Sequence, residues 1–387
     1  MIYYLFAHIQ SSGLLRVNPV QYETVRAGFA LFTAFFLSVI FGRYVIAILK
    51  ALKAGQPIRT ASAAGAIDLN AMHGSKAGTP TMGGILIVGT IVITTLLFCN
   101  LSNIYVWLLI IATLGFAALG FIDDYRKVTK HNANGISPMA KIAGQVALGL
   151  IVGCVLYLTA KCDPSAAVYS YRDGANTCGP FYGFDHIMVP FFKTFYPCLG
   201  IVYIAYVIFV LTGTSNAVNL TDGLDGLCIG TMSIVAMAFI ILAYVAGSQP
   251  LSAYLMVPYI KGAPEVVVFM GALIGACLGF LWYNAHPANM FMGDTGSLAL
   301  GGAIGTVALI CKQEILLTVI GGIFVIEALS VIIQVTSYKL RGKRVFLMSP
   351  IHHHFEKKNW HESKIIARFW IISILFALIG LCSLKLR

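Results

Sequence analysis

Long, continuous apolar runs are the feature that most constrains how this chain can fold. A helix needs roughly 20 mostly apolar residues to cross a bilayer, whereas strands of a membrane barrel are alternating segments of about ten. The runs here are continuous and lie at about 24–49, 81–99, 105–122, 140–159, 195–213, 227–246, 265–284, 296–311, 315–338 and 365–384. We therefore predict an all-α integral membrane protein of about ten transmembrane helices, with one polytopic domain over residues 1–387.

Charged residues are scarce enough to exclude other classes of protein. Lys and Arg number 26 and Asp and Glu 15, together 11% of 387 residues, whereas a soluble domain carries about 25% charge. The 58% hydrophobic content excludes a disordered chain, and nine cysteines are too few for a secreted disulfide scaffold. We expect the lipid bilayer as the surroundings and no nucleic acid as a partner.

Basic residues in the connecting loops predict the orientation. With the spans numbered in chain order, the loops after spans 1, 3, 5, 7 and 9 and their flanks hold 17 Lys and Arg, and the opposite face holds 9. Cytoplasmic loops are enriched in Lys and Arg, so we expect these loops in the cytoplasm and both termini outside it. The longest outer loop, about 160–194, contains Cys162 and Cys178, which could pair in an oxidising compartment. The sequence leaves that pairing and the loop's role open.

Five of the few acids lie at span ends on the predicted cytoplasmic face. Asp123 and Asp124 close the third span, where the helix dipole disfavours acids and neighbouring carboxylates raise each other's proton affinity. Asp222 and Asp225 precede the sixth span, where a spacing of i, i+3 would place both on one helical face. Asp294 precedes the eighth span. Neutralisation by basic neighbours and helix capping are the alternative interpretations, but clustered acids near Lys and His suit Mg²⁺ and phosphates.

Two further loops on that face carry groups suited to phosphate. Residues 74–84 contain Lys76, Thr81 and several glycines, without the spacing of a P-loop. Residues 350–356 read Pro-Ile-His-His-His-Phe-Glu. In a helix the three His side chains would point about 100° apart, whereas in an extended run His352 and His354 would share a side. Zinc is the weaker alternative here because no paired Cys or spaced His completes a site.

A transporter is the rival class. It would place ionisable groups near the middle of the membrane, and only Glu327 in the ninth span fits that description. The alternative for Glu327 is a buried structural acid that is protonated or hydrogen-bonded.

Five segments together resemble the MraY family of the polyprenyl-phosphate N-acetylhexosamine-1-phosphate transferase superfamily. They are residues 75–84, 121–127, 216–227, 284–297 and 350–356, in the order that the family has them. The Asp-Asp pair and the Asn-x-x-Asp-Gly-x-Asp-Gly element mark the superfamily, and the His run marks MraY more specifically. Two departures are a longer outer loop before the fifth span and Ala77, where many members have Arg.

The resemblance implies a ten-helix protein of the bacterial inner membrane, usually a homodimer. The implied enzyme transfers phospho-MurNAc-pentapeptide from UDP-MurNAc-pentapeptide to undecaprenyl phosphate, giving lipid I and UMP, and requires Mg²⁺. A related transferase that uses UDP-N-acetylglucosamine is the nearest alternative.

Residue roles follow from matching motif positions to the family. Asp294 resembles the Mg²⁺ ligand, Asp123 and Asp124 the catalytic pair, and His352 the active-site histidine. The sequence leaves open which acid acts as base and whether a covalent intermediate forms; we favour direct attack by the lipid phosphate. The residues that resemble the substrate-binding set are Lys76, Thr81, Lys127, Asn219, Asp222, Asp225, Asn284, Phe291, His353 and His354.

Overall fold

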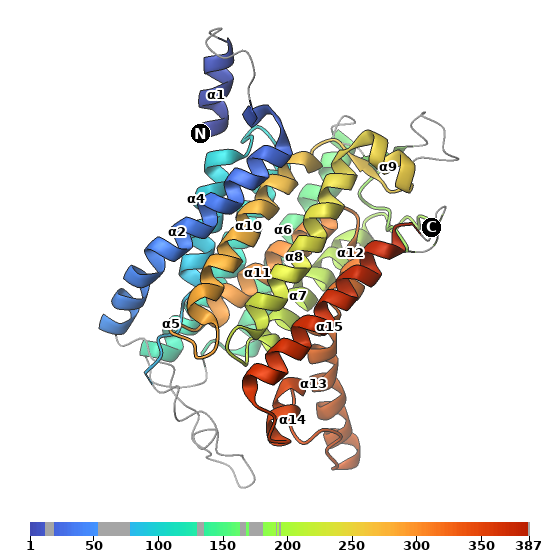
Figure 1. Ribbon diagram of the computed structural model, residues 1–387. Coiled ribbons are helices and arrows are strands. Elements are labelled where there is room, and N and C mark those ends of the chain that lie inside the picture. The colour runs from blue at the N-terminus through green and yellow to red at the C-terminus, as the bar shows by residue number, and fades with distance from the viewer. Residues whose placement is uncertain are drawn as a thin grey trace.

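The protein is a bundle of α-helices in the computed structural model, which describes residues 1–11, 19–52, 78–129, 135–162, 168–169, 181–190, 192 and 195–385. Within these ranges nine helices are long and apolar enough to cross a membrane, which confirms the all-α membrane architecture. Both termini lie at one end of the bundle and α14 (Ile351–Lys357) at the other (Figure 1). We call these the terminal end and the α14 end. The assignment of the α14 end to the cytoplasm stays a prediction.

The main helices follow the ten apolar runs in order. They are α2 (Glu23–Ala51), α4 (Gly84–Phe98), α5 (Ile104–Thr129), α6 (Pro138–Cys162), α7 (Val202–Thr221), α8 (Leu227–Gly247), α10 (Ala263–Asn284), α11 (Gly293–Ile310), α13 (Gly322–Arg341) and α15 (Glu362–Ser383). The short helices are α1 (Ile2–Ser11), a 3-10 turn (Pro19–Gln21), α9 (Gln249–Leu255), α12 (Glu314–Ile320) and α14. At 15 residues, α4 falls short of the roughly 20 that a full crossing needs.

The fifth and the ninth predicted spans differ from the prediction in ways that change the path of the chain. The fifth span, predicted at 195–213, is α7 and runs from Val202 to Thr221. Pro197 cannot donate a backbone hydrogen bond, and Gly200 has a φ of +54°, so the apolar residues before Val202 are not helical. The ninth span is interrupted at Gly321, which separates α12 from α13.

Burial divides the bundle into a protein core and a lipid-facing shell. The apolar windows of α8, α10 and α11 are 72%, 78% and 89% buried, whereas those of α2 and α13 are 17% and 22% buried. Exposed apolar side chains on the outer helices suit contact with lipid tails, because hydrocarbon is as apolar as they are. The core helices therefore set the frame on which the site is built.

A small antiparallel sheet lies outside the all-α prediction. Its two-residue strands β1 (Val168–Tyr169), β2 (Phe181–Tyr182) and β3 (Tyr259–Ile260) pair in the order β2-β1-β3. β1 and β2 belong to the long loop of about 160–194. The possible pairing of Cys162 with Cys178 lies outside the side chains that the structure describes.

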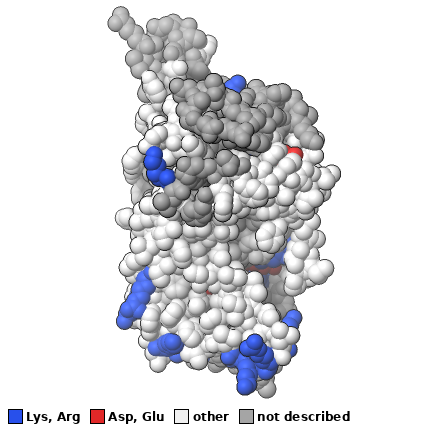
Figure 2. Space-filling model, turned by 90° about the vertical axis from the view of Figure 1, so that its right-hand side faces the viewer, with Lys and Arg blue, Asp and Glu red and all other residues white. Residues whose placement is uncertain are grey.

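Surface charge is distributed unevenly over the molecule. On the face shown in Figure 2, most of the Lys and Arg surface lies toward the α14 end, and Asp and Glu are almost absent from it. At the terminal end, Arg26 and Lys312 are buried and paired with Glu265 and Glu314, at 2.8 Å and 2.9 Å. These two were counted among the nine basic residues of the outer face, so fewer than nine remain on its surface.

Candidate active site

The candidate site begins where α5 meets the first turn of α11. Gly120 permits a close approach, since a Cβ there would lie 2.1 Å from the carbonyl oxygen of Asp294. One turn further along, the Asp124 carboxylate accepts the backbone N–H groups of Asp294 (3.2 Å) and Thr295 (2.9 Å) and the Thr295 hydroxyl (2.7 Å). N–H groups at a helix start lack helical partners and suit an anion. Asp124 is therefore a buried clamp between α5 and α11, with 4% of its surface exposed.

The sequence predicted that the third span ends at Asp123 and Asp124, but α5 continues beyond this acidic pair. It continues to Thr129, and the Lys127 ammonium pairs with the Asp123 carboxylate at 2.7 Å across one helical turn. Such i, i+4 pairs stabilise a helix. The two acids thus lie within the helix and not at its C-terminus, and Asp294 likewise lies inside the first turn of α11 and not before it.

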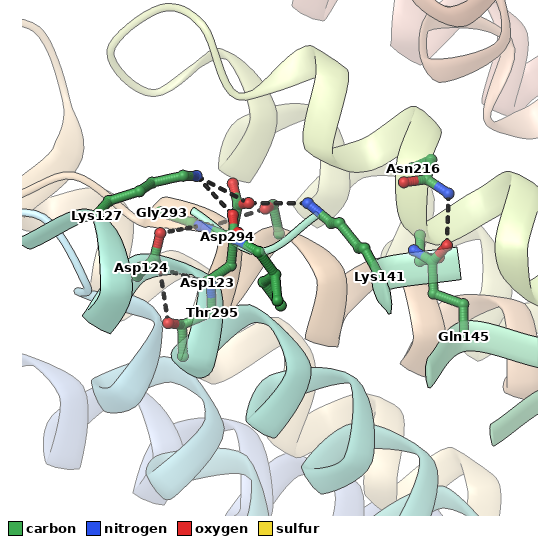
Figure 3. A network of polar contacts seen from close by, with 12 residues as sticks. Asp123, Asp124, Lys127, Lys141, Gln145, Asn216, Gly293, Asp294 and Thr295 are labelled. Atoms are coloured by element: carbon green, nitrogen blue, oxygen red, sulfur yellow. Dashed lines mark hydrogen bonds and ion pairs between the residues drawn. The ribbon is translucent and has the colours of Figure 1, made fainter. Parts of the chain in front are cut away.

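Two lysines from different helices meet at one carboxylate oxygen (Figure 3). Asp294 Oδ2 lies 3.1 Å from Lys127 Nζ on α5 and 2.9 Å from Lys141 Nζ on α6. Asp123 also accepts the backbone N–H of Ile136 at 2.6 Å, which holds the start of α6 against α5. Three carboxylates and two ammonium groups therefore form one partly buried cluster, which can bind phosphate as well as a cation.

This cluster has the donor chemistry that a Mg²⁺ ion needs. Mg²⁺ prefers carboxylate oxygens and fills its remaining positions with water and phosphate. Asp294 Oδ2 already pairs with two ammonium groups, and the Asp123 carboxylate pairs with one of them, that of Lys127. Asp294 and Asp123 could hold the ion, whereas both oxygens of Asp124 are engaged by α11.

The turn between α7 and α8 lies against the same cluster. Residues 222–226 are not helical, so the prediction of Asp222 and Asp225 on one helical face is wrong. The Asp222 carboxyl group accepts the N–H of Gly293, the first residue of α11. Burial, with Asp294 and Asp124 nearby, raises the pKa of Asp222 to about 8. Asp222 therefore holds its proton more strongly than an ordinary carboxyl group does.

Asp225 faces the loop that follows α10. Its Oδ2 accepts the backbone N–H of Ala288 at 3.1 Å and lies 3.2 Å from His286 Nδ1. Glu362, in the first turn of α15, accepts the N–H of Asp225 at 2.9 Å and lies 3.5 Å from the same imidazole nitrogen. These contacts fix the Asp225 carboxylate in the same turn as Asp222, facing the loop after α10 and the start of α15.

Asn284 ties two loops together at the end of α10, where the sequence placed it. Its Oδ1 accepts the N–H of Gly226 at 3.0 Å, and its Nδ2 donates to the carbonyl of Met290 at 2.8 Å. The buried amide thus joins the turn before α8 to the segment before α11. Both halves of its side chain have protein partners, so its contribution to the site is the placing of backbone.

The segment before α4 docks on the segment before α11. The Phe291 N–H donates to the carbonyl of Pro80, and its carbonyl accepts the N–H of Gly83, both at 2.9 Å. A Cβ at Gly293 would lie 3.0 Å from Thr81 Oγ1 and 2.6 Å from an Asp124 carboxylate oxygen. Thr81 therefore lies at the edge of the carboxylate cluster.

His352, on α14, lies between Glu327 of α13 and the turn at Gly223. Its Nδ1 lies 3.1 Å from Glu327 Oε1, and Glu327 Oε2 accepts the N–H of Ile351 at 2.8 Å. A carboxylate on one imidazole nitrogen selects the tautomer in which the other nitrogen is an acceptor. That nitrogen, Nε2, is buried without a hydrogen-bond partner in the described part of the chain and faces Gly223, where a Cβ would lie 2.2 Å from it. Glu327 is thus a structural partner of His352, as the alternative interpretation held.

The other two histidines diverge from His352. Residues 351–357 form α14, so the extended arrangement, with His352 and His354 on one side, is wrong. His353 Nδ1 contacts the Glu356 carboxylate, and His354 Nδ1 accepts the N–H of Leu347 at 3.1 Å. Burial and the nearby Lys358 lower the pKa of His354. Of the three, His352 is the one that joins the turn at Gly223.

The structure brings only part of the predicted set together at the cluster. Asn219 lies in the last turn of α7, with its carbonyl accepting the Asp222 N–H at 3.2 Å, and Lys76 lies outside the described residues. The sequence reasoning missed Lys141 as a site residue, although a lone Lys at the start of an apolar span was a usable signal. The predicted residues that meet at the cluster are Thr81, Asp123, Asp124, Lys127, Asp222 and Asp294, whereas His352 contacts the turn at Gly223, next to Asp222.

Comparison with known proteins covers the whole chain. The model of glycosyl transferase family 4 matches residues 106–312, and the phospho-N-acetylmuramoyl-pentapeptide-transferase signature 1 matches residues 76–88. Proteins named phospho-N-acetylmuramoyl-pentapeptide-transferase from Citrifermentans bemidjiense and Pelobacter propionicus are 48% and 49% identical over 387 residues, the full length of each pair. One from Syntrophus aciditrophicus is 47% identical over 371 residues, 96% of both chains. The chain therefore belongs to the phospho-N-acetylmuramoyl-pentapeptide-transferase family, the MraY family of membrane transferases.

Proposed function

We propose that this protein transfers phospho-MurNAc-pentapeptide from UDP-MurNAc-pentapeptide to undecaprenyl phosphate, forming lipid I and releasing UMP. The observation that carries the proposal is the meeting of Asp123, Lys127, Lys141 and Asp294 at one point of the helix bundle. A diphosphate and a lipid phosphate are both anionic, so paired ammonium groups suit both substrates. Family membership supports the same substrates, and the basic α14 end suits the cytoplasm, where a soluble nucleotide would arrive.

The two lysines are proposed to bind the reacting phosphates. Lys127 and Lys141 approach Asp294 from different helices, so a phosphate that competes with this carboxylate for the two ammonium groups would lie between two cations. Mg²⁺ held by Asp294, with Asp123 beside it, would neutralise charge on the diphosphate. Holding the reacting groups at a fixed distance lowers the entropic part of the barrier.

The two neighbouring acids are proposed to have different roles. Asp124 accepts three hydrogen bonds from α11, so its role is to hold Asp294 in place. Asp123 Oδ2 pairs with the Lys127 ammonium. When that flexible side chain turns toward a phosphate, the oxygen becomes free to accept a proton. Asp123 is therefore the proposed base that takes a proton from the lipid phosphate before its direct attack.

A reconstituted assay tests the reaction and its rivals. The purified protein is given undecaprenyl phosphate, Mg²⁺ and either UDP-MurNAc-pentapeptide or UDP-N-acetylglucosamine, and UMP release is followed. We expect UMP only with the first nucleotide and none after Mg²⁺ is chelated. Turnover only with UDP-N-acetylglucosamine would exclude the proposed substrate, and lipid or nucleotide-sugar flux across liposomes without UMP would point to a transporter. The homodimer and the inner membrane stay predictions, which native mass measurement and cell fractionation can test.

A further inference from the structure

A second group of chemically active side chains lies far from the proposed reaction. Asp185, His186 and Cys198 belong to the segment before α7, whereas Asp222 follows the other end of that helix. A helix of 20 residues is about 30 Å long, so α7 separates the two groups by roughly the thickness of a membrane. The proposed transfer reaction uses none of the three.

Backbone pairing brings these three side chains together. The Ile187 N–H donates to the carbonyl of Pro197 at 3.0 Å, and the Leu199 N–H donates to the carbonyl of Asp185 at 2.9 Å. His186 and Cys198 face each other across this antiparallel bridge. Directly opposed residues in such a pair have Cβ atoms about 4.5–5.5 Å apart. Main-chain bonds therefore hold the imidazole and the thiol near each other.

The donor atoms lie close enough together to share one metal ion. Asp185 Oδ1 lies 3.0 Å from His186 Nδ1, and Asp185 Oδ2 lies 3.6 Å from Cys198 Sγ. One ligand atom from each residue lies within 4.8 Å of the other two. Bond lengths of about 2.0–2.3 Å around tetrahedral zinc put neighbouring ligand atoms roughly 3.3–3.8 Å apart. The three donor atoms therefore lie close to the separations that one zinc ion requires.

The base of the loop is anchored, which favours a preformed site. Phe184, next to Asp185, is fully buried, and its carbonyl accepts the Lys312 ammonium at 3.0 Å. Lys312 is itself buried and paired with Glu314 at 2.9 Å. Ligands on a fixed backbone lose little conformational entropy when a metal binds. The set of a carboxylate, an imidazole and a thiolate is also typical of zinc and not of Mg²⁺ or Ca²⁺, which prefer oxygen alone.

We propose that Asp185, His186 and Cys198 bind one Zn²⁺ ion at the terminal end of the bundle, with water as the fourth ligand. Binding releases the thiol proton of Cys198 to solvent and involves no change of oxidation state. The site stands apart from the carboxylate cluster, so it does not depend on the proposed transferase reaction.

Cobalt provides a direct test, because a thiolate bound to Co²⁺ gives a charge-transfer band in the near ultraviolet. Full-length protein is purified in detergent with a reductant, stripped with a chelator and titrated with Co²⁺ and then Zn²⁺. We expect the band to appear at one Co²⁺ per chain and to vanish as Zn²⁺ displaces it. Cys198→Ser should abolish the band, and His186→Ala should weaken Zn²⁺ binding by at least about tenfold.

Cys382→Ser is the matched control, since Cys382 is another exposed cysteine near the terminal end and lies on α15. That variant should keep the band and the Zn²⁺ affinity. UMP release by all three variants verifies folding and should stay at the level of the unmodified protein. Absence of a band, or a band that survives Cys198→Ser, would overturn the proposed site whatever the outcome of the transferase assay.

Discussion

The contact between α5 and α11 makes Gly120 the most informative position to change. In Gly120→Ala the new Cβ would lie 2.1 Å and 2.4 Å from the carbonyl oxygen and carbon of Asp294, and 2.6 Å from the Thr295 nitrogen. All three are backbone atoms, so no side-chain rotation can relieve the overlap. Ordinary contact begins at 3.4 Å, so the helices must separate locally by roughly 1.3 Å, at a cost of about 1–3 kcal/mol.

That separation acts directly on the candidate site. The Asp124 bonds to Thr295, at 2.7 and 2.9 Å, would lengthen beyond about 3.5 Å, where a hydrogen bond is lost. Asp294 would move away from Lys127 by a similar distance. A displacement of about 1 Å in a reacting group can lower the rate about 10²-fold, so we expect kcat for UMP release to fall by that order.

Gly89→Ala on α4 is the control for the glycine change itself. Gly89 lies inside a helix, and nothing lies within 4 Å of a Cβ added there. Alanine at such a position favours the helix by about 0.5–1 kcal/mol, so kcat should be unchanged and the thermal midpoint equal or higher. A Gly120→Ala enzyme with the kcat of the unmodified protein would refute the claim that close approach of α5 and α11 builds the site.

Four further changes test individual groups. Asp294→Asn should abolish Mg²⁺-dependent UMP release, because an amide binds the ion poorly, while the thermal midpoint in detergent stays similar. Lys141→Ala should raise KM for the nucleotide substrate at least tenfold, because a cation on Asp294 is lost. Glu327→Gln should lower kcat and shift its pH profile, because the amide no longer selects the tautomer of His352. Asp222 has a folded-state pKa of about 8 against an ordinary 3.8, so the folded protein keeps a proton that the unfolded chain loses. Without Mg²⁺, stability should therefore fall as pH rises from about 4 to about 8, and Asp222→Asn should remove that part of the slope.

Each of these four predictions is contradicted by a specific result. Near-normal turnover of Asp294→Asn would remove that residue from the metal site, and an unchanged KM in Lys141→Ala would exclude a role in binding. An unaltered pH profile in Glu327→Gln would exclude a role of Glu327 in selecting the tautomer of His352. For Asp222, melting midpoints that depend on pH in the same way with and without the substitution would exclude the raised pKa.

Much of the fold could be read from the sequence because the signal is local. A run of about 20 apolar residues satisfies its own backbone as a helix, and a charged group inside such a run is costly, so rare acids stand out. Asp123, Asp124 and Asp294 were visible for that reason. The start of α7 was misplaced because apolar composition does not reveal where Pro197 and Gly200 stop a helix from forming.

The sequence by itself determined the class of protein, the order of its spans, the family and most of the residues of the candidate site. Only the tertiary structure decided how those residues meet: that Lys141 on α6 reaches Asp294, that Asp124 holds α11, and that His352 alone of the three histidines turns to Gly223. The physical reason is that apolar runs specify a helix but not its rotation or its distance from a neighbour. Those depend on close packing between helices, which a glycine such as Gly120 permits and which no local pattern displays.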